Sequence, residues 1–153
     1  MGIFGYSGLT RRDVRVYVVK SFEDEFDRRR LYALEPIPAD GRDDRIIGFG
    51  TYTGPAVRHM THLLSGLEEE IRILFLLTES GHQAIGYDGS YARTDVRKAF
   101  LEARKKGIMP FAISFGENGK EMLEESYGKD FVTVSNPLQL ARKMPEIYLR
   151  IMR

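Results

Sequence analysis

One apolar run, Ile71 to Ser80 with the sequence IRILFLLTES, constrains this chain more than any other stretch. A run rich in Ile, Leu and Phe with no polar alternation predicts a central strand of a parallel sheet, covered by helices on both faces. The run stops at Thr78, Glu79 and Ser80. Because ligands of open α/β sheets collect beyond the carboxyl ends of the strands, these residues are the first candidates for a functional site. The alternative is that they only cap the turn after the strand.

Composition excludes several classes of protein. The chain has 153 residues, enough for one domain with a core that needs no disulfide or metal, and we expect a single domain over 1–153. It has no cysteine, which excludes a thiol nucleophile and Cys-based metal sites. A formal net charge of +1 disfavours nucleic acid as a partner. No apolar run approaches the roughly 18 residues of a membrane helix. We therefore expect a soluble, cytoplasmic protein with no membrane insertion.

The rest of the chain predicts strands and helices in alternation, which is typical of a doubly wound α/β fold. The first two expected strands form a hairpin at the sheet edge. Between this hairpin and the next helix, residues 21–45 are rich in charge and proline and predict a short helical turn and an exposed loop. The expected strands are 2–7, 14–20, 71–77, 108–114 and 131–134, and the expected helices are 55–67, 94–106, 117–127 and 137–152.

Polar loops should meet Thr78 at one rim of the sheet. The loop 48–55, GFGTYTGP, supplies Thr51 and Thr53, with Thr53 a candidate N-cap of the helix that follows. The Gly- and Tyr-rich loop 81–93 is of the kind that carries binding contacts. Hydroxyls and carboxylates of this kind suit a hard cation such as Mg²⁺. His59 and His62 are a weaker metal signal, because no third ligand accompanies them.

From Ile3 onward, nearly the whole chain resembles the C-terminal von Willebrand factor A-type domain of the nitric-oxide-reductase activation protein family. The resemblance rests on GYSG, VRVYVVKSF, TYTGPAVRH, LFLLTES and NPLQLARKMPEIY, and most specifically on the long segment YDGSYARTDVRKAFLEARKKGIMPFAI. It implies a Rossmann-like three-layer sandwich with a mostly parallel sheet and one antiparallel edge strand.

The resemblance also implies a metal-ion-dependent adhesion site, at which a bound cation accepts a carboxylate from a partner. Thr51 matches the family's threonine, and Glu79 occupies the place of its aspartate. The family's Asp-x-Ser-x-Ser loop occurs nowhere in the chain, so we expect a site for Mg²⁺ that is partial or lost. The surrounding rim is expected to bind the partner through Thr53, Thr78, Ser80, Asp88, Tyr91 and Asp95.

The family's first, central strand is also missing from this sequence, so the resemblance implies an N-terminally truncated domain with two apolar strand edges facing a gap. Three outcomes stay open at this point. The two edges close on each other, a partner or a second copy supplies a strand, or the chain is an unstable remnant of a longer gene.

The function implied by the resemblance is a non-catalytic interaction module in the assembly or activation of a metalloenzyme. The expected companion is a MoxR-type AAA+ ATPase, and the expected client is nitric oxide reductase. Two alternatives remain. One is a degenerate gene fragment without independent function, and the other is a small α/β hydrolase-like enzyme that uses Glu79 as a general base.

Overall fold

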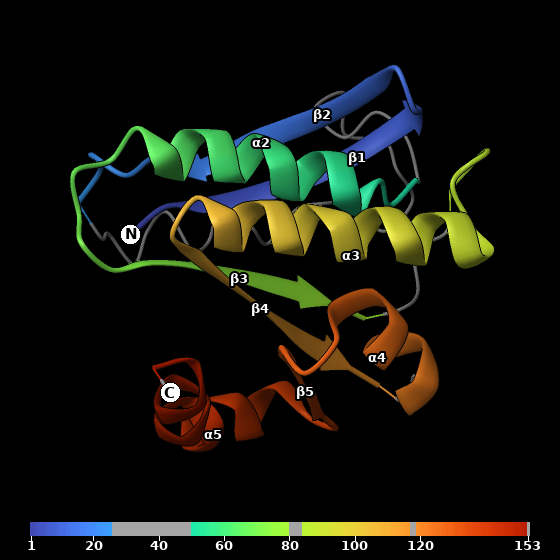
Figure 1. Ribbon diagram of the computed structural model, residues 1–153. Coiled ribbons are helices and arrows are strands. Elements are labelled where there is room, and N and C mark those ends of the chain that lie inside the picture. Colours follow the sequence, from blue (N-terminus) through green and yellow to red (C-terminus); the bar gives the residue numbers. More distant parts are fainter. Residues whose placement is uncertain (26–49, 80–83, 117–118, 153) are drawn as a thin grey trace.

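The computed structural model describes residues 1–25, 50–79, 84–116 and 119–152 (Figure 1). Strands and helices alternate from β3 onward, as the sequence predicts, and the fold is mixed α/β. The elements are β1 (Ile3–Thr10), β2 (Asp13–Lys20), α2 (Thr53–Ser65), β3 (Arg72–Thr78), α3 (Gly89–Lys105), β4 (Ile108–Phe115), α4 (Lys120–Tyr127), β5 (Phe131–Val134) and α5 (Pro137–Ile151).

The described strands form two separate sheets. The hairpin of β1 and β2 is antiparallel, as expected, and β3, β4 and β5 form a parallel sheet in that order. The sequence predicted a mostly parallel sheet that lacks its first central strand, with two strand edges facing a gap. Among the described residues no strand lies between β1 and β3, and the two sheets stay separate. Helices α2 and α3 lie side by side above β3 and β4, and α5 lies on the opposite side of the parallel sheet (Figure 1).

Strand β3 departs most from its prediction. It was expected to be covered on both faces, yet Phe75 is 36% exposed and Leu77 is 57% exposed. On its other face Leu76 is buried in the main core. Among the described strands β3 lies at the edge of its sheet, and α5 packs through Ile147 against β4 and β5 instead of covering this face of β3.

The main core lies between the helices and the sheets. The spacing of four apolar residues along the predicted helix 94–106 predicts one inward face, and all four are buried: Val96, Ala99, Phe100 and Ala103. Helical spacing also predicts an inward stripe on α2 made of Val57, Met60, Leu63, Leu64 and Leu67. Of these, Val57 and Leu64 are buried and the other three are half-buried. The two helices therefore bury their apolar faces against one shared core.

Several element boundaries differ from those predicted. Strand β1 continues to Thr10 rather than ending at Ser7, since it pairs with β2 along that length. Helix α3 begins at Gly89, five residues before the predicted start at residue 94. Helix α4 begins at Lys120 rather than at residue 117. Most of the predicted turn and loop at 21–45 lies outside the described residues.

Gly107 ends the segment after α3 with a φ of +72°, a conformation that glycine adopts without steric cost. Strand β5 has the predicted bounds. Pro145 lies inside α5 without breaking it. None of the described helices is long and apolar enough to cross a membrane.

Candidate functional site

The candidate rim lies where the carboxyl end of β3 meets the starts of α2 and α3, on the right of Figure 1. Thr78 ends β3 and lies opposite Ser114 of β4 in the parallel register. Tyr52 precedes α2 and Asp88 precedes α3. The fold thus brings together three of the loops that the sequence assigned to one rim.

A buried tyrosine and an ion pair join these loops. The hydroxyl of Tyr87 donates a hydrogen bond to Oδ2 of Asp95 at 2.8 Å and accepts one from the backbone N–H of Gly54 at 2.9 Å. The Nη1 of Arg58 pairs with Oδ1 of Asp95 at 2.8 Å, and its Nε donates to Glu102 at 2.6 Å. Both oxygens of Asp95 are therefore engaged, Oδ1 by Arg58 of α2 and Oδ2 by Tyr87 of the loop before α3.

The environment of Tyr87 fixes its protonation state. Its side chain is 1% exposed. Burial of the hydroxyl raises the pKa of Tyr87 above its ordinary value of 10.0, and the hydrogen bond to the carboxylate of Asp95 raises it further. At neutral pH the hydroxyl keeps its proton and can donate to Asp95 continuously.

Two further tyrosines tie the hairpin to the start of α2. The hydroxyl of Tyr6 on β1 lies 3.0 Å from Oγ1 of Thr53. The hydroxyl of Tyr52, which is fully buried, donates to the carbonyl oxygens of Leu9 and Ile85 at 3.3 and 3.0 Å. Thr53 was predicted to cap α2. That prediction is wrong, because Tyr52 occupies the N-cap position and no side chain caps the helix there.

An aromatic side chain is presented at the outer side of the network. Tyr91, in the first turn of α3, is 52% exposed and meets the ring of Tyr87 edge-on at 5.7 Å between centroids. The guanidinium of Arg11, at the tip of the hairpin, lies 5.4 Å from the centre of the Tyr91 ring. Asp88 is exposed beside them. This corner combines an aromatic surface with both signs of charge.

The other predicted site residues lie closer to β3 and the start of α2. Thr51 and Thr78 are half-buried, and Glu79 is exposed directly after β3. Ser80 lies outside the described residues. The structure thus separates the predicted rim into two groups. Thr53 and Asp95 are committed to internal hydrogen bonds, whereas Glu79, Asp88 and Tyr91 face solvent.

The donor set of the rim fits a cation poorly. Within the part of the chain that the structure describes, no three His, Cys, Asp or Glu side chains come close enough to hold a metal ion. The half-buried carboxylate of Asp95 is paired with Arg58. A threonine hydroxyl and one glutamate are donors of the right kind for Mg²⁺, but they supply too few oxygens for its octahedral shell.

Sequence reasoning missed Tyr6, Tyr52, Tyr87 and Arg58 as members of the site. The sequence could have indicated Tyr87, because this residue lies in the loop 81–93 that we predicted to carry binding contacts. Nothing in the spacing of Arg58 on α2 indicated that it would reach Asp95 and Glu102 on a neighbouring helix. Long-range partners of this kind follow from tertiary packing.

The fold and rim define an α/β protein whose parallel sheet ends in a polar surface held by a tyrosine and ion-pair network. Comparison with known proteins narrows this class. Over 144 residues the chain is 30% identical to Protein NorD of Stutzerimonas stutzeri, a match that covers 91% of this chain and 22% of the relative. Protein NorD of Brucella abortus (strain 2308) is 31% identical over 151 residues, with 95% of this chain and 22% of the relative covered.

An uncharacterized protein of Pseudomonas aeruginosa is 30% identical over 156 residues, which cover 99% of this chain and 24% of that protein. The chain therefore spans about a quarter of the length of the curated relatives it matches. No protein-family model matches the chain, and no solved structure matches it significantly. The similarity to proteins named NorD supports a NorD-like family for this chain.

Proposed function

We propose that this chain is a non-catalytic protein-interaction module of NorD-like type, which acts in the activation or assembly of nitric oxide reductase. The observation that carries the proposal is the similarity of 30–31% to proteins named NorD over more than nine-tenths of the chain. The module would have a von Willebrand factor A-type fold, and its companion would be a MoxR-type AAA+ ATPase.

The rim supports a docking role for the corner of Asp88, Tyr91 and Arg11. An exposed tyrosine supplies a large contact area at a low entropy cost, and aromatic and arginine side chains are the usual energetic centres of interfaces. The buried Tyr87 ring supports Tyr91 from below, and Asp95 fixes Tyr87. The contact surface is therefore held in place before a partner arrives, which reduces the entropy cost of binding.

The competing enzyme proposal has less support. A glutamate that acts as a general base needs an enclosed site that brings its pKa near the working pH. Glu79 is exposed at the end of an edge strand. The carboxylate that does lie in a partly enclosed site, Asp95, is paired with Arg58 and accepts from Tyr87. We therefore favour the interaction module.

The test is binding to a purified MoxR-type ATPase from the same organism, measured by biolayer interferometry with the chain immobilised. Tyr91→Ala should weaken binding at least tenfold, because it removes the exposed ring at the centre of the corner. Asp88→Asn should weaken it less, since it removes only a charge at the edge of the surface. Tyr148→Ala is the matched control, because Tyr148 is a similarly exposed tyrosine at 48% on the distant helix α5.

If Tyr91→Ala weakens binding no more than Tyr148→Ala does, the loss is not specific to the corner. The contact would then lie elsewhere than the rim. Failure of the unmodified chain to bind either the ATPase or nitric oxide reductase would contradict the interaction module itself. Each variant is first compared with the parent by thermal unfolding, so that a folding defect is recognised before binding is interpreted.

A further inference from the structure

A cleft lies along the outer edge of β5, at the side of the parallel sheet opposite to β3. Its volume is about 570 Å³, and its walls come from α4, the turn at Gly128, β5 and the side chain of Arg150 on α5. In Figure 1, β5 lies between α4 and α5. The cleft therefore joins one edge of a sheet to two helices, and it is separate from the rim.

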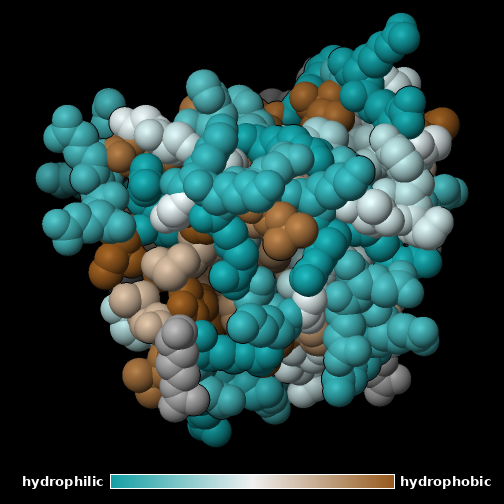
Figure 2. Space-filling model, in the orientation of Figure 1, coloured by the Kyte–Doolittle hydropathy of each residue, from teal (hydrophilic) through white to brown (hydrophobic). Residues whose placement is uncertain are grey.

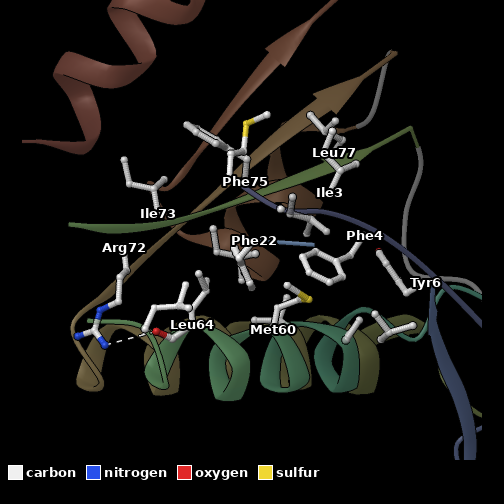
Figure 3. A pocket seen from close by; sticks show the side chains of 18 of the residues that line it. Ile3, Phe4, Tyr6, Phe22, Met60, Leu64, Arg72, Ile73, Phe75 and Leu77 are labelled. Carbon is white, nitrogen blue, oxygen red and sulfur yellow. Dashed lines mark hydrogen bonds between the residues drawn. The ribbon is translucent and has the colours of Figure 1, made fainter. Parts of the chain in front are cut away.

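The lining of this cleft is charged, unlike that of the groove between β1, β3 and α2. Figure 3 shows the groove, whose labelled side chains are apolar except for Tyr6 and Arg72. In Figure 2, hydrophobic side chains gather around a hollow on the left of the molecule, whereas hydrophilic side chains cover the surface over α4. Charge therefore helps to identify an occupant of the cleft at β5.

Three cations at the cleft have no carboxylate partner among the described residues. They are Lys129, in the turn before β5, and Lys143 and Arg150 on α5. Glu146 lies between the last two in the sequence of α5, but within the described part of the chain it forms no ion pair with either. The positive charge of this group is therefore not cancelled from within α5.

Two carboxylates close to these cations are already engaged. Glu124 of α4 lines the cleft and pairs with Lys120 at 3.4 Å, so these two charges cancel. Asp130 follows Lys129 directly in the sequence, but it pairs with Arg104 of α3. The cleft therefore carries a positive charge that the described residues do not neutralise, and carboxylates of a partner would be attracted to it.

Two of the cations are held in place by the backbone at the edge of β5. The Nη2 of Arg150 donates to the carbonyl oxygen of Lys129 at 2.7 Å, and the guanidinium lies 5.7 Å from the centre of the Phe111 ring. The Nζ of Lys143 donates to the carbonyl oxygen of Thr133 at 3.4 Å. Both cationic groups have further N–H donors, so each can bind a carboxylate in addition.

The backbone along this edge also has open hydrogen-bonding groups. The N–H of Ala112 on β4 donates to the carbonyl oxygen of Asp130 at 2.8 Å, so Asp130 faces β4. Successive residues of a parallel strand direct their backbone groups to opposite edges, so those of Phe131 and Thr133 face the cleft. Among the described strands β5 pairs with β4 alone, and Lys143 caps the carbonyl of Thr133. An extended chain beside β5 would therefore find both backbone donors and an acceptor to pair with.

An extended acidic polypeptide satisfies both features of the cleft. Its backbone pairs with the edge of β5, and its carboxylates meet the cations. A nucleic acid would meet the cations but leave the backbone groups of the strand unpaired. A second copy that paired through its own β5 edge would bring Lys129 and Arg150 of both copies together, and like charges across a strand pair are destabilising.

We propose that this cleft binds an extended acidic segment of a partner polypeptide, which adds to β5 as a further strand and places carboxylates against Lys143 and Arg150. These two cations lie about two helical turns apart on α5, roughly 10.5 Å. The carbonyl groups that they hold, from Lys129 to Thr133, span roughly 13 Å of extended chain. Because alternate side chains of a strand share a face, acidic residues at alternate positions of the segment would meet both cations. The proposal does not depend on the docking role of the rim.

The test uses a fluorescently labelled peptide of seven residues in which glutamate alternates with threonine and valine. Fluorescence anisotropy is measured against the full chain. The expected result is saturable binding that weakens at least tenfold when every glutamate is replaced by glutamine, because the charge is removed and the shape is kept. Absence of binding would overturn the proposal, since Lys143 would then only protect the strand edge from pairing. Equal binding of the two peptides would overturn it as well.

Two N-methylated forms of the glutamate peptide test the strand pairing. Methylation removes backbone donors and keeps the side chains, and only one alternate set of amides in an added strand faces β5. Methylation of one set should weaken binding at least tenfold, whereas methylation of the other set should change it little. Equal effects of the two forms would contradict the addition of a strand. A single-stranded oligonucleotide that displaces the peptide and binds more tightly would overturn the proposal in favour of nucleic acid.

Variants locate the binding to the cleft. Lys143→Gln combined with Arg150→Gln removes two cations beside the peptide and should weaken its binding at least tenfold. The matched control combines Arg12→Gln with Lys98→Gln, which removes two exposed cations at the hairpin turn and on α3, and it should leave binding unchanged. An equal loss in both double variants would assign binding to net charge and overturn the proposal.

Thermal unfolding of each variant shows first whether it folds. If the variant without Lys143 and Arg150 does not fold, the peptide series still decides the question. A chain whose solution mass doubles with concentration and which then ignores the peptide would overturn the proposal in favour of a second copy as the occupant.

Discussion

The hydroxyl of Tyr87 lies 2.8 Å from Oδ2 of Asp95 and donates its hydrogen to it, which ties the loop before α3 to the helix itself. The same hydroxyl accepts from the backbone N–H of Gly54, so one buried atom joins the start of α2 to α3. The rim loops are therefore positioned by a bond that no local pattern in the sequence specifies. Its removal should loosen both helix starts together.

The first prediction concerns that hydroxyl. Tyr87→Phe keeps the ring and deletes the oxygen, which leaves the N–H of Gly54 without its acceptor and one oxygen of Asp95 without its donor. Unpaired buried groups of this kind cost about 1–3 kcal/mol of unfolding free energy. For a chain of this size that corresponds to a fall in Tm of roughly 2–12 °C.

Chemical denaturation followed by circular dichroism measures the change. The control is Tyr148→Phe, at an exposed tyrosine of α5, which should change stability by less than about 0.5 kcal/mol. Equal stability of Tyr87→Phe and the parent chain would mean that water or another group replaces the lost bonds.

The second prediction concerns the space beside the same hydroxyl. A methyl group at Gly54 would lie 2.7 Å from the hydroxyl of Tyr87 and still closer to the carboxylate of Asp95. Glycine to alanine in a helix ordinarily stabilises by about 0.5–1 kcal/mol. Here the sign should reverse, because the methyl group separates Tyr87 from Asp95, and Gly54→Ala should destabilise by about 1–3 kcal/mol.

Gly66→Ala is the matched control. Gly66 ends α2 in a right-handed conformation, and a methyl group there would meet its nearest neighbour at 3.5 Å, an ordinary contact. We expect Gly66→Ala to be neutral or slightly stabilising in the same denaturation experiment. A stabilising effect of Gly54→Ala would show that the network can shift to make room.

How far the sequence predicts this fold depends on the range of the interaction. The apolar face of α3 and the strand at 131–134 follow from local periodicity, and both have the predicted residues. The burial of β3 does not follow from local periodicity. Whether its second face is covered depends on which elements pack against that face. The run IRILFLL reads as a fully buried strand, yet Phe75 and Leu77 are exposed at the sheet edge.

The candidate site likewise has features that the sequence predicts and features that it does not. That polar residues would gather at the carboxyl end of β3 follows from a general property of parallel sheets. The same property does not tell which of these side chains are available to a partner. Asp95 and Thr53 were expected to face a partner, and the structure uses them to hold Arg58 and Tyr6. A polar side chain at a rim can serve either purpose, and only its three-dimensional neighbours distinguish the two.

The third prediction concerns Mg²⁺. The described rim supplies too few oxygen ligands, so millimolar Mg²⁺ should leave the Tm unchanged, with an EDTA-treated sample as the reference. A competent site at 100 times its Kd would add about 2.7 kcal/mol to the unfolding free energy, which thermal unfolding detects easily. A rise in Tm with Mg²⁺ that is absent in Glu79→Gln would contradict this prediction and assign Glu79 to a working metal site.

The last prediction concerns alkaline pH. The pKa values of Tyr6, Tyr87 and Tyr127 are raised above 10.0, chiefly because burial disfavours the phenolate, with Asp95 adding to the effect at Tyr87 and Tyr6 at Tyr127. In the unfolded chain these groups lose their protons near pH 10, whereas in the folded chain they keep them. The unfolded state is therefore favoured as the pH rises, and the stability present below pH 10 is lost above it.

Each tyrosine that stays protonated in the folded state should lower the unfolding free energy by about 1.4 kcal/mol per pH unit above 10, so the three together should make the decline steep. Urea unfolding at a series of pH values from 9 to 11.5 measures this slope, and absorbance at 295 nm follows tyrosinate formation. Tyr127→Phe should reduce the slope by about a third, because it removes one of three titrating groups. An unchanged slope would mean that Tyr127 ionises in the folded chain as readily as in the unfolded one.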